Sequence, residues 1–160
     1  MNTFLPGDLV FYTSRGRWYE QIITAATHGP YVHVAVVDKD GEHLIAALTR
    51  GITRIALPFG PGAIFTQTHT LAPAAKPEDA FLWLEQQVGK QYGFADIFDQ
   101  GLRLLHSPVY LSRPNALDCS DLAACFAAMY TQDDKLMAQV MNARQLIAPN
   151  DLARYYGLLK

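Results

Sequence analysis

The stretch Ala116-Leu-Asp-Cys-Ser-Asp-Leu-Ala-Ala-Cys125 marks the point where a polar loop ends and an apolar helix begins. The loop stops at Asp118, so Cys119 falls in the first turn of a helix that is expected to run to about Tyr130. Unsatisfied N–H groups and the positive end of the helix dipole favour an anion there. Because the thiolate is the nucleophilic form of cysteine, the pattern indicates Cys119 as a candidate nucleophile. The alternative is that Cys119 is a small buried side chain at a helix start.

The second cysteine, Cys125, lies six residues further along the same expected helix. At about 100° per residue the two thiols project from different faces, so a disulfide between them is geometrically difficult. Its neighbours Ala124 and Phe126 favour a place in the core. The chain has no Cys/His spacing typical of a zinc site, and two unpaired cysteines fit a reducing compartment.

A nucleophilic cysteine needs a base to take its proton, and all five histidines precede Cys119. A Cys/His dyad in this chain therefore has the histidine first. His33 is the best candidate base because it interrupts the apolar run 31–37, where a buried imidazole is costly without a partner. A histidine in a strand can equally be a satisfied core residue, so this position is only suggestive.

The other histidines have simpler explanations. His28 and His106 close expected helices, where the negative end of the helix dipole favours an imidazolium. His43 projects from the face of its expected strand that points away from His33, and His69 lies in an alternating Thr-Gln-Thr-His-Thr run that can face solvent.

Hydrophobic periodicity divides the chain into a β-rich first half and a helical second half. Strands are expected over residues 8–12, 31–37, 42–47, 52–57 and 63–71. The turn 38–41 predicts that the second and third of these form a hairpin. Helices are expected over residues 17–28, 80–88, 94–106, 119–130, 133–141 and 152–156. The fold class is therefore α+β, with an antiparallel sheet followed by packed helices.

Composition excludes some classes of function but does not select one. Half of the residues are hydrophobic, 18% are charged and the formal net charge is -2, as in ordinary globular proteins. The 160 residues fit one domain, 1–160, and the scattered Lys and Arg give no basic face for a nucleic acid. No apolar run reaches the ~20 residues of a membrane span, and the N-terminal residues do not resemble a signal peptide. We therefore expect a cytoplasmic chain as synthesised, without a metal or organic cofactor.

Two motifs resemble those of NlpC/P60 cysteine peptidases. Asp118-Cys-Ser-Asp-Leu122 is similar to the Asp-Cys-Ser-Gly-Leu nucleophile motif of that family, with Asp121 in place of glycine. Gly7-Asp-Leu-Val-Phe11 is similar to the Gly-Asp-Leu-Val-Phe strand of the same family. In ordinary members that strand follows the cysteine and precedes the histidine.

Here the strand and the histidine come first, which resembles the circularly permuted branch, the YaeF/YiiX-like papain-like amidases. The segments Tyr31-Val-His-Val-Ala-Val-Val37 and Gly89-Lys-Gln-Tyr-Gly-Phe94 precede the Cys119 motif in the order found in that branch. The resemblance covers about residues 7–130, and the order of the motifs is its specific part. It implies a papain-like fold with a sheet or small barrel packed against helices.

One departure from the family concerns the residue that orients the imidazole. If Val37 pairs with Glu42 across the hairpin turn, then Ala46 lies opposite His33, where the family would place an acid or another polar group. The third group is then absent or comes from elsewhere, with Glu42 a distant candidate on the same face. The loop backbone or a water could hold the tautomer instead.

The resemblance implies a thiol hydrolase in which His33 deprotonates Cys119 and the thiolate attacks an amide or ester carbonyl. A peptidoglycan peptide is the first choice of substrate, reached through phage lysis or a secretion system. One alternative is a lipid thioesterase or acyltransferase similar to lecithin:retinol acyltransferase, in which Trp18, Tyr19 and Phe59 either line an acyl groove or belong to the core. The other is a catalytically inactive binding module on the same scaffold. The oligomeric state is not indicated.

Overall fold

A computed structural model of the chain describes residues 4–57, 65–91, 117–142 and 148–160. These ranges contain a five-stranded antiparallel sheet and five helices, so the predicted α+β class is confirmed. The strands are β1 (Leu9–Thr13), β2 (Tyr31–Val37), β3 (His43–Leu48), β4 (Gly51–Ala56) and β5 (Phe65–His69). The helices are α1 (Trp18–Thr27), α2 (Pro77–Gln87), α4 (Cys119–Thr131), α5 (Asp134–Met141) and α6 (Pro149–Tyr155). The helix expected over 94–106 lies outside the described residues.

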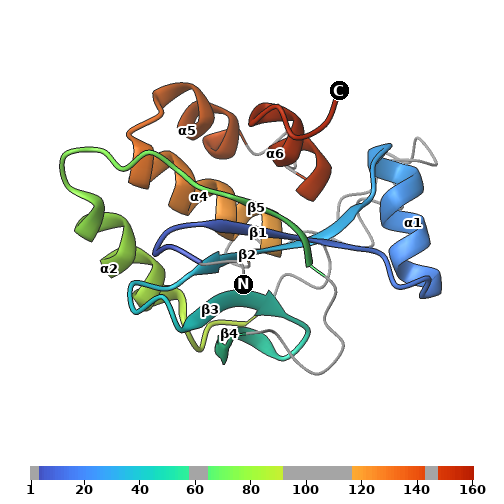
Figure 1. Cartoon of the computed structure of the whole chain (residues 1–160), viewed down its shortest axis with the longest axis horizontal. Helices are drawn as coiled ribbons and strands as arrows, with labels where there is room; N and C mark the ends of the chain where they lie inside the picture. Colours follow the sequence, from blue (N-terminus) through green and yellow to red (C-terminus); the bar gives the residue numbers. More distant parts are fainter. Residues whose placement is uncertain (1–3, 58–64, 92–116, 143–147) are drawn as a thin grey trace.

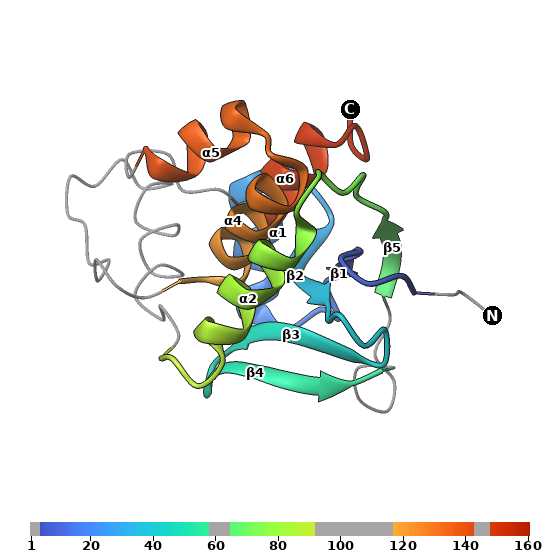
Figure 2. The same ribbon diagram turned by 90° about the vertical axis from the view of Figure 1, so that its left-hand side faces the viewer.

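The strands follow the order β4-β3-β2-β1-β5, and each is antiparallel to its neighbours. Among the described strands β4 and β5 are the two edges, so these strands form an open sheet. Helix α4 packs on β2 and β3, and it is itself contacted by α2, α5 and α6 (Figures 1 and 2). Helix α1 lies at the end of the sheet, apart from α2, α4 and α5 (Figure 1).

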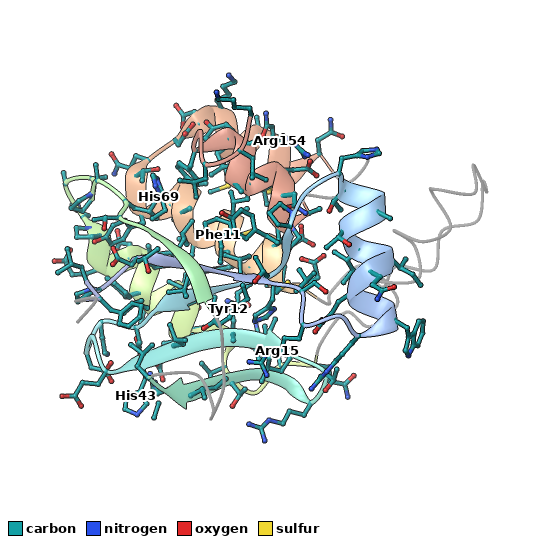
Figure 3. All side chains as sticks on the ribbon, turned by 45° about the vertical axis from the view of Figure 1, so that its right-hand side comes forward. Phe11, Tyr12, Arg15, His43, His69 and Arg154 are labelled. Carbon is teal, nitrogen blue, oxygen red and sulfur yellow. The ribbon has the colours of Figure 1, made fainter. Side chains whose placement is uncertain are left out.

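Strand β1 is apolar from Leu9 to Tyr12, where both of its faces are buried. Leu9 and Phe11 belong to the core between the sheet and the helices, where they join Phe126 of α4. Val10 and Tyr12 belong to a second apolar cluster on the opposite face. Figure 3 labels Phe11 on the side of β1 that faces the helices and Tyr12 on the side away from them. A strand buried on both faces reads as a continuous hydrophobic run, and β1 fits that rule.

The glycine and aspartate that precede β1 have a structural explanation. Gly7 has a φ of +87°, and a Cβ at this position would lie 2.7 Å from the ring of Tyr130. Its N–H donates to the carbonyl of Val37 at 2.9 Å. The buried carboxylate of Asp8 accepts the N–H of Leu5 at 2.9 Å and closes the turn before the strand. Only glycine combines this φ with so close an approach.

The β2–β3 hairpin has a different register from the one that the sequence predicts. Val37 pairs with Leu44, whereas the sequence predicts Glu42 as its partner. The turn is longer than expected, because the N–H of Asp38 donates to the carbonyl of His43 at 2.8 Å. The predicted pairing is therefore wrong by two residues, a slip that keeps every side chain on its predicted face.

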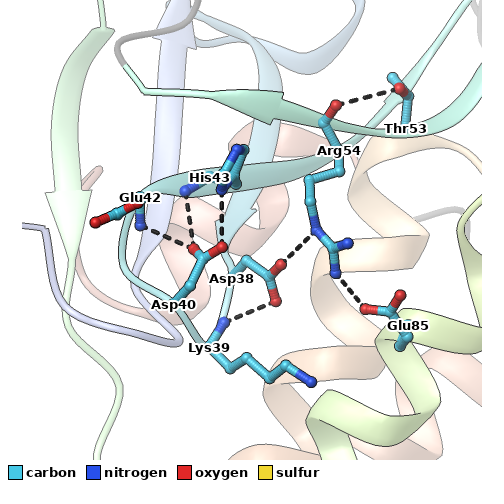
Figure 4. Close-up of polar contacts among 8 residues, drawn as sticks. All are labelled: Asp38, Lys39, Asp40, Glu42, His43, Thr53, Arg54 and Glu85. Carbon is cyan, nitrogen blue, oxygen red and sulfur yellow. Dashed lines mark hydrogen bonds and ion pairs between the residues drawn. The ribbon is translucent and has the colours of Figure 1, made fainter.

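An ion-pair network joins that turn to β4 and α2 (Figure 4). The Nε of Arg54 donates to the buried carboxylate of Asp38 at 2.7 Å, and the same guanidinium pairs with Glu85 of α2. Next to it, the ring of His43 bonds to Asp40 at 2.7 Å on the exposed side of the turn. Arg54 therefore connects the hairpin turn, an edge strand and a helix that are distant in sequence.

Helix α6 holds the corner between α1 and β2. The buried carboxamide of Asn150 accepts the N–H of Tyr31 and donates to its carbonyl, both at 2.9 Å, and it also donates to the hydroxyl of Thr27. A Cβ on Gly29 would lie 2.4 Å from this carboxamide. Arg154, one turn later, donates to the carbonyl of Thr27 at 2.9 Å. The first residue of β2 is therefore held by a side chain from the far end of the chain.

We expect Asn150→Ala to destabilise the fold by roughly 2–4 kcal/mol, because it leaves the buried N–H and C=O of Tyr31 without their partner. The free energy of unfolding from urea titration measures this. Gln86→Ala is the control, since it removes an exposed carboxamide and should change stability by less than ~0.5 kcal/mol. Equal effects of the two substitutions would contradict a clamping role for Asn150.

Candidate active site

Cys119 is the first residue of α4, as the sequence predicts. The helix begins here because the Asp118 carboxylate caps it and accepts the N–H groups of Ser120 and Asp121, both at 2.7 Å. A short acceptor at this position satisfies the otherwise unbonded donors of a first turn. The carboxylate takes the second and third N–H groups of the helix, and the N–H of Cys119 itself is not one of those it binds.

The thiol of Cys119 is buried against β2. Its side chain is 7% exposed, and its Sγ lies 3.8 Å from the hydroxyl oxygen of Ser120. The backbone of Val34 also makes a hydrogen bond to this thiol. Val34 directly follows His33 on β2, so Cys119 of α4 contacts this strand at the residue next to His33.

The electrostatics of the helix start oppose a thiolate. Burial raises the pKa of the Cys119 thiol to about 12, and the negative charges of Asp118 and Asp121 add to this rise. The hydrogen bond from the backbone of Val34 acts in the opposite direction and is outweighed. The expectation that this helix start favours a thiolate is therefore wrong for this structure, since burial and, after it, the charge of the capping carboxylate outweigh the groups that favour the anion.

His33 lies on the face of β2 that carries the second apolar cluster. It pairs with Tyr12 of β1, and the centroids of the two rings are 5.5 Å apart. Burial lowers the pKa of His33 from 6.5 to about 4. The imidazole is therefore neutral at pH 7, and the neutral form is the one that can accept a proton.

The imidazole of His33 and the thiol of Cys119 lie in clusters on different faces of the sheet. The His33 ring contacts Tyr12, whose cluster lies on the face away from α4, whereas Cys119 belongs to the cluster between the sheet and the helices. The thiol reaches the backbone of the strand at Val34, beyond Val36, the last residue of β2 that is paired with β3. Within the described part of the chain no hydrogen bond joins the thiol to the imidazole, so the dyad stays a prediction.

The residue expected opposite His33 is also different. The pairing of β2 with β3 ends at Val36 and Ile45, in a register that does not bring Ala46 opposite His33. The predicted pairing of Ala46 with His33 is therefore wrong. Glu42 is exposed in the turn at the other end of the hairpin, several residues along the strands from His33, and cannot orient the ring.

The remaining histidines of the described structure have other surroundings. His28 ends α1 in a left-handed conformation, and His43 bonds to Asp40. His69, which the sequence leaves facing solvent, is partly buried and stacks on Tyr156 with ring centroids 4.5 Å apart. His106 lies outside the described residues.

Other predicted features have mixed outcomes. Both cysteines are free, and Cys125 is only partly buried, with a pKa that burial raises to about 12. Trp18 is 71% exposed, so the prediction that it belongs to the core is wrong. Phe59 and Tyr92 lie outside the described residues. The described residues contain no group of three or more His, Cys, Asp or Glu side chains that could hold a metal ion.

Two features of the site escape sequence reasoning. Tyr12 lies beside His33 because β1 and β2 are paired, and no local pattern gives that register. The contact of the Val34 backbone with Cys119 depends on main-chain geometry, which leaves no signal in residue types.

Comparison with protein-family models, curated proteins and solved structures finds no match to this chain. Helix α4, the longest of the helices described, has 13 residues, and none of these helices is long and apolar enough to cross a membrane. A function for this protein must therefore be inferred from the site itself.

Acid should destabilise the fold through His33. The folded-state pKa is about 4 and the unfolded value is 6.5, so between these values the unfolded chain binds a proton that the folded chain does not. The stabilising contribution is complete above pH 6.5 and is lost as the pH falls toward 4. We expect His33→Gln to flatten the loss of unfolding free energy over this window. Measurements at pH 8, where the imidazole is neutral in both states, isolate the packing effect, and an unchanged acid slope would contradict the buried neutral ring.

Proposed function

We propose that the chain is a thiol hydrolase of the permuted NlpC/P60, papain-like type, with Cys119 as nucleophile and His33 as base. The observation that carries the proposal is the position of Cys119. It is the first residue of a carboxylate-capped helix, and it contacts β2 at the residue after His33. The neutral imidazole is a second supporting feature, since a general base must be unprotonated to act.

In the proposed mechanism, the thiol proton passes to His33 as the sulfur attacks the carbonyl carbon. A carbon–sulfur bond forms, and the carbonyl electron pair moves to oxygen, where the backbone N–H of Cys119 donates to it. The imidazolium then gives its proton to the leaving amine, and water hydrolyses the thioester. Burial disfavours each charge alone, so thiolate and imidazolium form together and compensate each other.

The proposed substrate is an amide bond in a cell-wall peptide. This choice rests on the likeness of the Asp118-Cys-Ser-Asp-Leu122 segment to the nucleophile motif of the cell-wall peptidases. Hydrolysis of a lipid acyl ester by the same thiol would pass through the same kind of thioester. Cell-wall peptides and lipid acyl esters should therefore be tested in one assay. Delivery to the wall by phage lysis or a secretion system would bring such an enzyme to its substrate.

We expect Cys119→Ala to abolish turnover of peptidoglycan fragments or acyl lipids. Mass spectrometry of the reaction products measures this turnover. Cys125→Ala is the matched control, because it removes the same atom from the same helix and should leave turnover largely unchanged. Each substitution removes little volume, so thermal melts should show under ~1.5 kcal/mol of lost stability. Equal turnover by wild type and Cys119→Ala would refute the thiol mechanism.

A non-catalytic binding module is the second candidate, and the raised pKa of the thiol favours it. Iodoacetamide labelling of Cys119 distinguishes a hydrolase from a binding module. For a hydrolase we expect His33→Gln to slow labelling at pH 7.5 at least ~10-fold, since general-base assistance contributes factors of that size or more.

In a binding module the same substitution should change nothing. The labelling rate would then rise with pH up to the thiol pKa of about 12, independently of His33.

A further inference from the structure

Where β3 separates from β2, one backbone N–H of β2 lies beyond the pairing of the two strands. In the hairpin the N–H of Asp38 donates to the carbonyl of His43 on β3. Successive N–H groups of a strand alternate between its two neighbours, so Val36 and Val34 also direct their N–H groups toward β3. The ladder between the strands consists of the pairs Val36 with Ile45 and Val37 with Leu44. The N–H of Val34 therefore lies just beyond the last rung.

The opposite edge of β2 is occupied over the same residues. The N–H of Val37 donates to the carbonyl of Asp8 at 2.8 Å, and pairing with β1 continues past His33 to Tyr31, with a bulge between Tyr12 and Thr13. Strand β2 thus stays attached to β1 while β3 leaves it. At this point of β2 the Val34 backbone makes a hydrogen bond to the thiol of Cys119.

We propose that the backbone N–H of Val34 is a catalytic group of this site, which stabilises the negative charge that develops at Cys119. It would act first on the sulfur and then on the oxygen of the adduct, together with the N–H of Cys119. This inference rests on the proposed hydrolase function and deepens it.

The physical basis is that both donors are held by secondary structure. Val34 is fixed by the pairing of β2 with β1, and its side chain is fully buried. The N–H of Cys119 is fixed by the capped start of α4. Donors that are already oriented in a site with little water need no reorganisation when charge appears, and the loss of one such donor typically slows turnover ~10²–10³-fold.

The test uses the full-length protein labelled with ¹⁵N and the probe acetyl-alaninal carrying ¹³C in its aldehyde carbon. The thiol adds to this aldehyde, so a carbon–sulfur bond forms, the carbonyl electron pair moves to oxygen, and the thiol proton ends on that oxygen or on His33. No group leaves, so the adduct can be studied at equilibrium by NMR.

We expect the adduct to shift the Val34 amide proton downfield and to slow its exchange with deuterium at least ~10-fold. Val36 is the matched control, since its N–H points to the same edge but remains in the ladder and should not move. Without the aldehyde, Cys119→Ala should speed exchange at Val34 and not at Val36, while Cys125→Ala should change neither.

The outcomes separate the two hypotheses. An adduct on Cys119 that moves the amide of Cys119 but leaves Val34 unchanged would overturn the role of Val34 and leave the hydrolase proposal standing. A protein that forms no ¹³C thiohemiacetal at Cys119, at any aldehyde concentration that leaves it folded, would overturn both.

Discussion

Alternation along β2 sends the side chains of His33 and Val34 to opposite faces of the sheet, and the whole site depends on how Cys119 meets that strand. Helix α4 can cover only one face, so the thiol belongs to the core on the Val34 side. It reaches the backbone where β3 has left β2. A fully paired sheet would separate thiol and imidazole by a layer of main chain, and under the proposed mechanism the two groups meet where β3 has left β2.

The cap of α4 fixes the position of Cys119 and also opposes its ionisation. The Asp118 carboxylate satisfies two N–H groups of the first turn, and such a cap is typically worth about 1 kcal/mol. The same charge raises the pKa of the adjacent thiol, as does Asp121, which stands where the resembling family has glycine. A thiolate at this site therefore requires a compensating cation, and the proposed source is the imidazolium of His33.

The sequence predicts the elements of this fold better than their pairing. The run 31–37 is β2 residue for residue, and the helix at Cys119 begins where the polar loop ends. The predicted hairpin register is wrong because a slip of two residues keeps every side chain on its face and leaves the hydrophobic pattern unchanged. The pKa of the thiol is wrong because local position suggests a helix dipole, whereas burial by β2 and the capping charge are properties of the assembled fold.

The departures from the family motifs affect side chains, whereas the groups proposed to hold negative charge belong to the main chain. Asp121 adds a charge that disfavours the thiolate. That departure does not alter the direction of the N–H groups of Val34 and Cys119, because strand pairing and helix capping determine those directions. Under the proposed mechanism, such a side-chain change should therefore impede formation of the thiolate more than it weakens the stabilisation of the adduct.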